Sequence, residues 1–298
     1  MKRFVQIILF ASSVGGMLAA ACIGNEPSPL PAISHDDGGG APSTADAGLP
    51  SSIRGLALWL DGADPATVEL VAPNDRRVAR WKDKSTNNWH FRTPDGGAPP
   101  RFVNSATNNG KTAIGFTRAN NEYLEGPGLH YQLTAADAFI VAETTRVTGN
   151  DADETYGLWG FSPSPTRHPF IASDGGGLIL QETFGSSRYW VASPPDPRQI
   201  TTLHLYQITT RPKAWIMRLN TVQVYEIRGD TVTVAFMNDR VILGNTFSAG
   251  NVPPSYAFNG TIAELVVFDR ELSPEERDTV NAYLIEKWAI RYPDGGRL

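Results

Sequence analysis

The chain contains one cysteine among its 298 residues, and that cysteine stands at position 22. An intrachain disulfide and a cluster of thiolate metal ligands are therefore excluded. Charged residues make up only 19% of the sequence, and the net charge of −5 provides no basic field that would attract a phosphate backbone. We accordingly expect no nucleic acid partner.

The sequence also lacks common spacings of catalytic side chains. His90, His130, His168 and His204 are scattered. No two of them show a His-x-x-x-His spacing, and none stands beside a serine in a nucleophile elbow. A catalytic triad therefore has no support in the sequence.

What the chain does have is glycine and proline, 28 and 22 residues, with hydrophobic residues at 41%. This balance is typical of a turn-rich β-protein. Short apolar or alternating runs recur between turn signals and predict an all-β sandwich of two antiparallel sheets. These runs are 56–60, 113–116, 138–142, 178–180, 190–192, 203–208, 214–219, 222–227, 232–236, 241–243 and 262–268. Residues 221–224 and 231–234 alternate around Arg228-Gly229-Asp230, which predicts that these two segments form a hairpin.

One helix is strongly indicated near the end of the chain. Ser273 is a suitable N-cap, Pro274 fits the first turn, and Glu276 completes a capping box. An apolar stripe at helical spacing follows and predicts that the helix packs on the sandwich. The stripe consists of Val280, Tyr283, Leu284, Lys287 and Trp288.

The first 21 residues have the basic start, short apolar core and small-residue end of an export signal. Residues 18–22, Leu-Ala-Ala-Ala-Cys, resemble the bacterial lipobox, in which the cysteine is acylated and becomes the new N-terminus. The resemblance implies a secreted lipoprotein anchored in the bacterial cell envelope through Cys22. Ile23 in place of aspartate resembles outer-membrane sorting, in a periplasmic or surface-exposed position. An ordinary cleaved signal peptide is the alternative.

A spacer is expected over residues 22–52. Positions 23–52 hold five prolines, five glycines, five serines and four alanines, with no aromatic residue and no lysine or arginine. Such a composition buries too little apolar surface to offset the entropy of ordering the chain. We therefore expect a flexible tether before a folded domain that begins at Ile53.

Three blocks resemble bacterial laminin-G-like (LamG) domains of the concanavalin A-like lectin and glucanase superfamily. They are Leu56–Asp64, Val78–His90 and Phe258–Ser273. The resemblance covers roughly residues 53–290, leaves 291–298 as a tail, and implies a jelly-roll sandwich with one C-terminal helix. Where the family pattern usually has Ser-Gly-Asn-Gly, this chain has Ser85-Thr86-Asn87-Asn88, so the turn there is expected to differ.

Laminin-G-like domains often bind calcium, and the resemblance therefore makes Asp61, Asp83 and Asn87 candidate Ca²⁺ ligands. Carboxylate and amide oxygens are the hard ligands that Ca²⁺ prefers. The alternative is that Asp61 and Asp83 cap turns and accept hydrogen bonds from loop amides.

Glycan binding would need an exposed aromatic face with polar groups around it. The middle of the chain offers such residues, and the alternative is that Trp159 and Trp190 belong to the core. The candidate ligand-binding residues are Tyr156, Trp159, Arg167, Asp174, Tyr189 and Trp190.

Function is expected to be binding rather than catalysis. The Glu-x-Asp-x-Glu motif of related retaining β-glucanases is missing from the sequence. We therefore expect a non-catalytic module that recognises a glycan or an adhesion ligand, such as an envelope protein. A polysaccharide hydrolase or lyase with an atypical site and a purely structural envelope protein are the alternatives.

Overall fold

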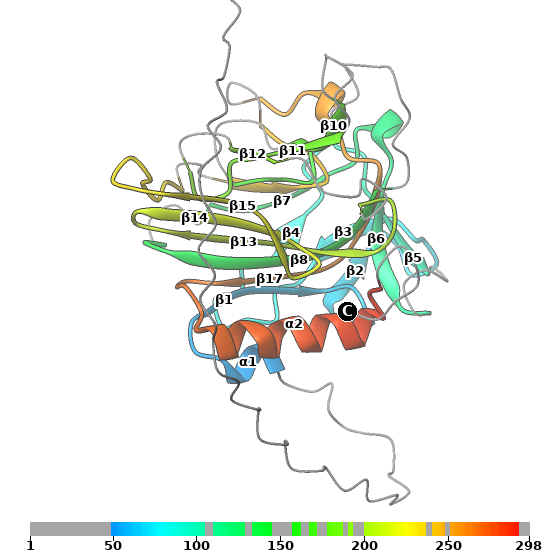
Figure 1. The fold of residues 1–298 in the computed structure, drawn as a ribbon. Coiled ribbons are helices and arrows are strands. Elements are labelled where there is room, and N and C mark those ends of the chain that lie inside the picture. Colours follow the sequence, from blue (N-terminus) through cyan, green and yellow to red (C-terminus); the bar gives the residue numbers. More distant parts are fainter. Residues whose placement is uncertain are drawn as a thin grey trace, which may run out of the picture. The chain divides into compact units, whose positions relative to one another are not determined.

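The computed structural model describes the chain in ten segments (Figure 1). The described residues are 49–104, 110–128, 133–144, 157–161, 167–171, 178–186, 190–192, 200–236, 240–247 and 251–291. Their strands pair antiparallel throughout and form two stacked sheets and a smaller third one, and a helix follows the last strand. The expected all-β sandwich with a C-terminal helix is therefore confirmed.

The largest sheet has eight strands in the order β15-β14-β13-β8-β17-β6-β5, and β1 also pairs with β17. Its long central strands run side by side over their full length, which makes it the platform of the domain (Figure 1). The strands are β1 (Leu56–Asp61), β5 (Arg101–Asn104), β6 (Thr112–Phe116), β8 (Ala136–Thr144), β13 (His204–Arg211), β14 (Ala214–Leu219), β15 (Val222–Arg228) and β17 (Gly260–Phe268).

The second sheet has six short strands in the order β2-β3-β4-β7-β16-β9, and a third sheet has the order β10-β11-β12. The six strands are β2 (Val68–Leu70), β3 (Val78–Trp81), β4 (Phe91–Arg92), β7 (Leu124–Pro127), β9 (Trp159–Gly160) and β16 (Arg240–Leu243). The other three are β10 (Arg167–Ile171), β11 (Leu178–Glu182) and β12 (Trp190–Ala192).

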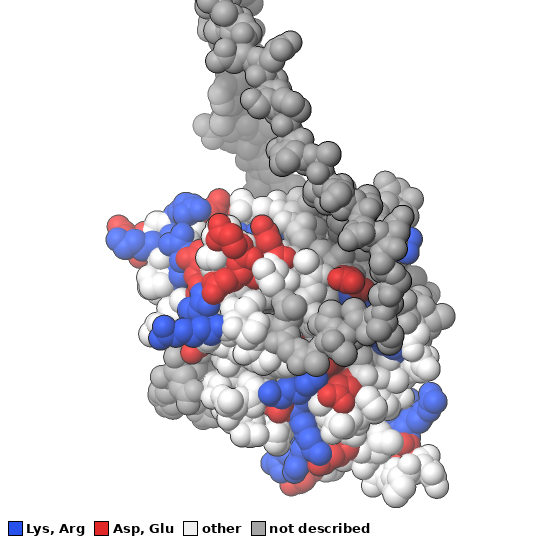
Figure 2. All heavy atoms as spheres, turned by 90° about the horizontal axis from the view of Figure 1, so that it is seen from below, with Lys and Arg blue, Asp and Glu red and all other residues white. Residues whose placement is uncertain are grey.

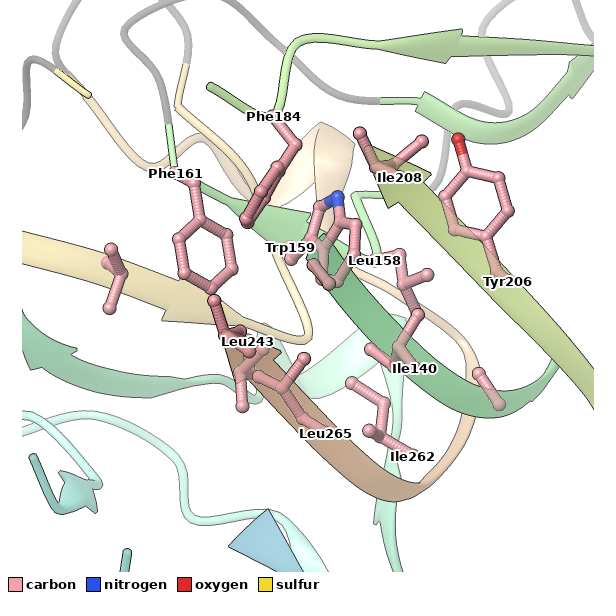
Figure 3. Close-up of a cluster of buried hydrophobic side chains, with 14 of the residues drawn as sticks. Ile140, Leu158, Trp159, Phe161, Phe184, Tyr206, Ile208, Leu243, Ile262 and Leu265 are labelled. Carbon is pink, nitrogen blue, oxygen red and sulfur yellow. The ribbon is translucent and has the colours of Figure 1, made fainter. Parts of the chain in front are cut away.

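The main core lies between these sheets. It combines side chains of the large sheet, such as Ile140 and Leu265, with Trp81 and Leu243 of the six-stranded sheet. Leu180 of β11 joins the same cluster. Figure 3 shows part of this core, where aromatic and branched side chains from several strands fill the space between the layers. Burial of this apolar surface is the main force that holds the sheets together.

The large sheet is apolar on its other face as well, because helix α2 (Pro274–Trp288) covers that face. Phe139 and Val266 of the sheet pack with Leu284 and Trp288 of α2 in a second core cluster. This explains why the central strands read as continuous apolar runs rather than alternating ones. A short helix, α1 (Leu49–Ser52), lies next to α2 (Figure 1).

Helix α2 begins as the sequence predicts. The Ser273 hydroxyl accepts from the Glu276 amide at 3.2 Å, and the Glu276 carboxylate accepts from the Ser273 amide at 2.9 Å. The helix ends at Trp288, and the C-cap residue Ala289 adopts a left-handed conformation with a φ of 49°. Within the described residues, no helix is both long and apolar enough to cross a membrane.

The predicted hairpin between 221–224 and 231–234 is wrong. Strand β15 instead pairs with the preceding strand β14 through the two-residue turn Asn220-Thr221. Both turn residues have positive φ, 48° and 68°, which is the backbone of a type I′ hairpin turn. Residues 232–236, also expected to be a strand, form none, and Val234 makes only an isolated bridge to Ser186.

His204, the first residue of β13, links the stability of the domain to pH. Its ring is fully buried, and its Nδ1 lies 3.0 Å from the Thr202 carbonyl. Burial lowers the pKa of His204 from 6.5 to about 4. The folded protein therefore binds fewer protons than the unfolded chain between these two values, and stability must fall as the pH decreases through that window.

We predict that the wild type loses up to about 3 kcal/mol of unfolding free energy between pH 6.5 and pH 4 that a His204→Gln variant does not lose. Urea unfolding of both proteins across this range measures the difference. Carboxylates that titrate in the same range contribute equally to both proteins and cancel. Parallel pH profiles for the two proteins would show that His204 is not held neutral by burial.

Candidate functional site

A cluster of buried charges lies between β1, β17 and α2. The Lys287 ammonium lies 2.8 Å from Oδ1 of Asp61 and 2.8 Å from Oε2 of Glu264. All three residues are almost fully buried, at 7%, 4% and 0% exposure. Lys84, which is partly exposed, reaches Oδ2 of Asp61 at 3.0 Å. Asp61 is thus held by two ammonium groups, one on each oxygen.

Three aromatic residues complete this cluster by donating to Glu264. The indole nitrogens of Trp59 and Trp288 donate to its two oxygens at 2.8 and 2.6 Å, and the Tyr283 hydroxyl donates at 2.9 Å. Lys287 also donates to the Tyr283 hydroxyl at 2.8 Å. Each polar group in the cluster therefore has a partner, as buried polar groups require.

The pKa values of the two carboxylates in the cluster are shifted in opposite directions. Burial alone would raise the pKa of Asp61, but the charges of Lys287 and Lys84 outweigh it and leave the pKa below its ordinary value. Burial raises the pKa of Glu264, and the nearby charge of Asp61 raises it further, against the opposing effect of Lys287. Glu264 is therefore the better proton acceptor of the two.

Asp83 organises the loop after β3. Its Oδ1 accepts from the Trp59 amide at 2.9 Å and the Ser85 amide at 2.8 Å. Its Oδ2 accepts from the Ser85 hydroxyl at 2.6 Å and the Trp89 amide at 2.8 Å. Asn87, the third expected calcium ligand, donates its side-chain amide to the Ala57 carbonyl at 2.8 Å.

These contacts favour the turn-capping alternative over a calcium site. The oxygens of Asp61 and Asp83 already accept from ammonium and amide donors, which a cation would have to displace. Across the described segments, no group of three or more His, Cys, Asp or Glu side chains is arranged to hold a metal ion.

Trp159, expected at a glycan site, is a core residue instead. It is fully buried on β9, and its Nε1 donates to Oε2 of the buried Glu182 at 2.8 Å. Its ring contacts those of Phe161, Phe184 and Tyr206 (Figure 3). The core alternative therefore applies to Trp159, because the residue presents no face on which a sugar could stack.

The other candidates lie partly or wholly outside the described residues. Arg167 is the first residue of β10 and Trp190 the first of β12, and only their backbone is described. Tyr156, Asp174, Tyr189 and Cys22 lie outside the described residues altogether. Their roles in ligand binding and acylation stay predictions.

A groove of about 680 Å³ lies along α2. Its apolar lining residues are Ala282, Ile285, Ala289 and Ile290, and its polar ones are Thr221, Asp278, Asn281, Glu286 and Arg291. On the face seen in Figure 2, the described acidic and basic side chains are intermixed. A groove of this size and mixed chemistry can hold a small polar ligand.

Three buried amide side chains, one in the groove and two on neighbouring strands and turns, have atoms without a hydrogen-bond partner. Asn281 is 7% exposed, and its Oδ1 has no partner. Asn220, next to Thr221, leaves its Nδ2 unpartnered, and Gln207 leaves both amide atoms unpartnered. Gln207 lies two residues after Leu205, which contacts the helix cluster, so alternation places Gln207 on the α2 side of β13.

Sequence reasoning missed Asn281, although a signal exists. Its spacing from Leu284 and Trp288 places an amide beside the predicted apolar stripe of α2. An unpartnered buried amide costs on the order of 1–3 kcal/mol, so a residue of this kind in a docked helix marks a functional or strained position.

No protein-family model and no curated protein sequence matches the chain. Among solved structures, a mutant of HCR/D has a TM-score of 0.51 with 12% identity, over 79% of this chain and 54% of that chain. The binding domain of botulinum neurotoxin serotype D has a TM-score of 0.49 with 11% identity, over 78% and 52%. Domain 4 of the arabinanase AbnA from Geobacillus stearothermophilus, solved with arabinotriose, has a TM-score of 0.47 with 15% identity, over 75% and 97%.

These likenesses concern the fold alone, because the sequence identities are so low. The chain spans about half the length of the HCR/D and neurotoxin chains that it matches. The HCR/D match agrees with the two-sheet antiparallel sandwich that the strand pairing shows directly.

The capping role of Asp83 predicts a large loss of stability without any involvement of calcium. Asp83→Ala should lower the unfolding free energy by about 3 kcal/mol, because three backbone amides and a hydroxyl lose their acceptor. Asp64→Ala is the control, since Asp64 is more exposed, its Oδ1 caps only the Ala66 amide, and its Oδ2 pairs with Lys84 at 3.0 Å near the surface. It should cost about 1 kcal/mol.

Denaturant titrations with and without millimolar calcium measure both effects. We expect calcium to leave the wild type and both variants unchanged. A calcium-dependent stabilisation that is present in the wild type and absent from Asp83→Ala would instead make Asp83 a metal ligand.

Proposed function

We propose that this chain is a lipid-anchored, non-catalytic binding module that recognises a carbohydrate at the bacterial cell envelope, as a laminin-G-like domain would. The observation that carries the proposal is the groove along α2, with the unpartnered acceptor of Asn281 in its wall. The large sheet, on which α2 packs, holds that wall in a fixed position.

The chemistry of the groove fits hydroxyl groups. The exposed carboxylates of Asp278 and Glu286 are acceptors, and sugar hydroxyls are donors that can satisfy them. Oδ1 of Asn281 is a buried acceptor without a partner, which a hydroxyl reaches when the side chain turns into the groove. Ile285 and Ile290 supply apolar surface for the C–H groups of a sugar ring. A neutral saccharide matches this set better than an anionic ligand, because two carboxylates face one guanidinium, that of Arg291.

The same groove is poorly suited to glycoside hydrolysis. Asp278 and Glu286 are eight residues apart on α2, which corresponds to about 12 Å along the helix axis. Paired catalytic carboxylates lie about 5–9.5 Å apart. The buried carboxylates of the domain, such as Glu264 and Glu182, are occupied by structural donors. These features support binding rather than turnover.

Asn281 provides the direct test. We predict that Asn281→Ala weakens saccharide binding by about tenfold, because one ligand hydroxyl loses its acceptor. The same change should raise the unfolding free energy by about 1 kcal/mol, because alanine is the better helix former and the unpartnered oxygen is removed. A glycan array identifies the ligand, and calorimetry and urea unfolding measure the two effects.

Thr279→Ala is the matched control, since Thr279 lies on the exposed side of α2 and bonds only the Glu275 carbonyl in the same helix. It should leave saccharide binding unchanged. An empty glycan array together with co-purification of one envelope protein would favour the structural alternative. Release of reducing ends from a polysaccharide, abolished by one carboxylate substitution, would favour the enzyme.

The anchor is tested separately. We predict that cells expressing the wild type incorporate a palmitate analogue into the protein, whereas cells expressing Cys22→Ala do not, because an acyl thioether needs the cysteine sulfur. Ser13→Ala, a change within the same signal segment, is the control and should keep the label. Equal labelling of the wild type and Cys22→Ala would remove the lipid anchor from the proposal.

A further inference from the structure

The buried charge cluster under α2 brings a nucleophile and an acyl group into contact. Nζ of Lys287 lies 2.8 Å from Oδ1 of Asp61, and both residues are almost fully buried. The two residues come from opposite ends of the domain and are 226 positions apart in the chain. Their contact places the amine against the carboxyl group in a geometry from which an amide can form.

Glu264 provides a proton acceptor at the same point. Its Oε2 lies 2.8 Å from the same Nζ, and the residue is fully buried. Trp59, Tyr283 and Trp288 hold it in place through three hydrogen bonds and exclude water from around it. Exclusion of water favours condensation over hydrolysis and makes separated charges costly.

We propose that Lys287 and Asp61 are joined by an intramolecular isopeptide bond, with Glu264 as the proton carrier. Starting from the ammonium and the carboxylate, Glu264 moves one proton from Nζ to Oδ1 of Asp61. The Nζ lone pair then forms a bond to Cγ, a second proton passes by the same route to Oδ1, and the Cγ–Oδ1 bond breaks. Oδ1 leaves as water, Oδ2 becomes the amide oxygen, and Glu264 returns to its starting state.

The surroundings also support the intermediate of this reaction. Lys84 holds Oδ2, the oxygen that carries negative charge when Nζ adds to Cγ, at 3.0 Å. The Ala63 amide donates to Oδ1 at 3.0 Å and fixes the orientation of the carboxyl group. The raised pKa of Glu264 agrees with a group that can take up and return a proton.

The isopeptide bond would remove the desolvation penalty of the Lys287–Asp61 ion pair. A buried ion pair carries a desolvation penalty that its mutual attraction only partly offsets, whereas an amide is neutral. The bond would also link β1, the first strand, to α2, the last helix, and close a covalent loop through nearly the whole domain. Such a link stabilises the folded state by restricting the unfolded chain.

Peptide mapping of the full chain tests the bond directly. Trypsin should yield one branched product in which Gly55–Arg76 is joined to Asp278–Arg291, lighter than the two peptides together by the mass of one water molecule. Cleavage after Lys287 should be blocked, because trypsin needs a free lysine side chain. The wild type needs no substitution for this measurement, so a folding defect cannot obscure it.

Three variants define the chemistry. Lys287→Arg keeps the positive charge beside Asp61 but has no amine, so the branched peptide should vanish and the melting temperature should fall by roughly 10 °C. Glu264→Gln cannot carry the proton, and we expect its Lys287 and Asp61 peptides to remain separate. Asp61→Asn should still condense with Lys287, with loss of ammonia in place of water.

Separate, unmodified peptides from the wild type, with cleavage after Lys287, would overturn the proposal and leave a buried ion pair. A branched peptide in Glu264→Gln would overturn the role of Glu264 as proton carrier. The outcome does not depend on the proposed saccharide site, since neither Asp61 nor Lys287 lines the groove.

Discussion

The domain depends on one buried carboxylate, Glu264, in the middle of the largely buried strand β17. A carboxylate at this point of β17 is tolerable only because nitrogen and hydroxyl donors of Lys287, Trp59, Tyr283 and Trp288 surround it. These partners come from β1 and α2, so the need to satisfy Glu264 fixes where the helix lies on the sheet. Each Glu264 oxygen accepts from two donors, so removal of any one of them would halve the hydrogen bonding of a buried oxygen.

The helix anchored in this way has two different sides. Tyr283 and Lys287, on one side, contact the buried carboxylate of Glu264. Asn281 and Ile285, on the other side, line the groove. The helix can therefore serve as a rigid wall, because its docking energy comes from contacts that a ligand does not touch. Rigid placement of the groove residues on α2 reduces the ordering entropy that binding would otherwise have to offset.

Much of the fold could be predicted from the sequence, because strands and helix starts are indicated by residues that are close together in the chain. Long apolar runs such as 262–268 became strands, and the capping box at Ser273 became a helix start. Very short strands, such as the two-residue strands β4 and β9, were not predicted because they are too short to show the alternation of apolar and polar residues. The hairpin was misassigned because Asn220-Thr221 lacks glycine, although both residues adopt positive φ.

The candidate site was much less predictable, because it depends on which residues meet in space. A glutamate inside an apolar strand and a lysine in an apolar helical stripe are visible in the sequence as two separate anomalies. Nothing local shows that Glu264, Lys287 and Asp61 converge, since their contact spans 226 positions. Likewise, Asp61 resembles a calcium ligand until the neighbouring ammonium groups are seen. A charged residue that interrupts a strong apolar pattern therefore predicts a distant partner of opposite charge, because a buried charge must be paired. The chemistry of the site depends on which residue that partner is.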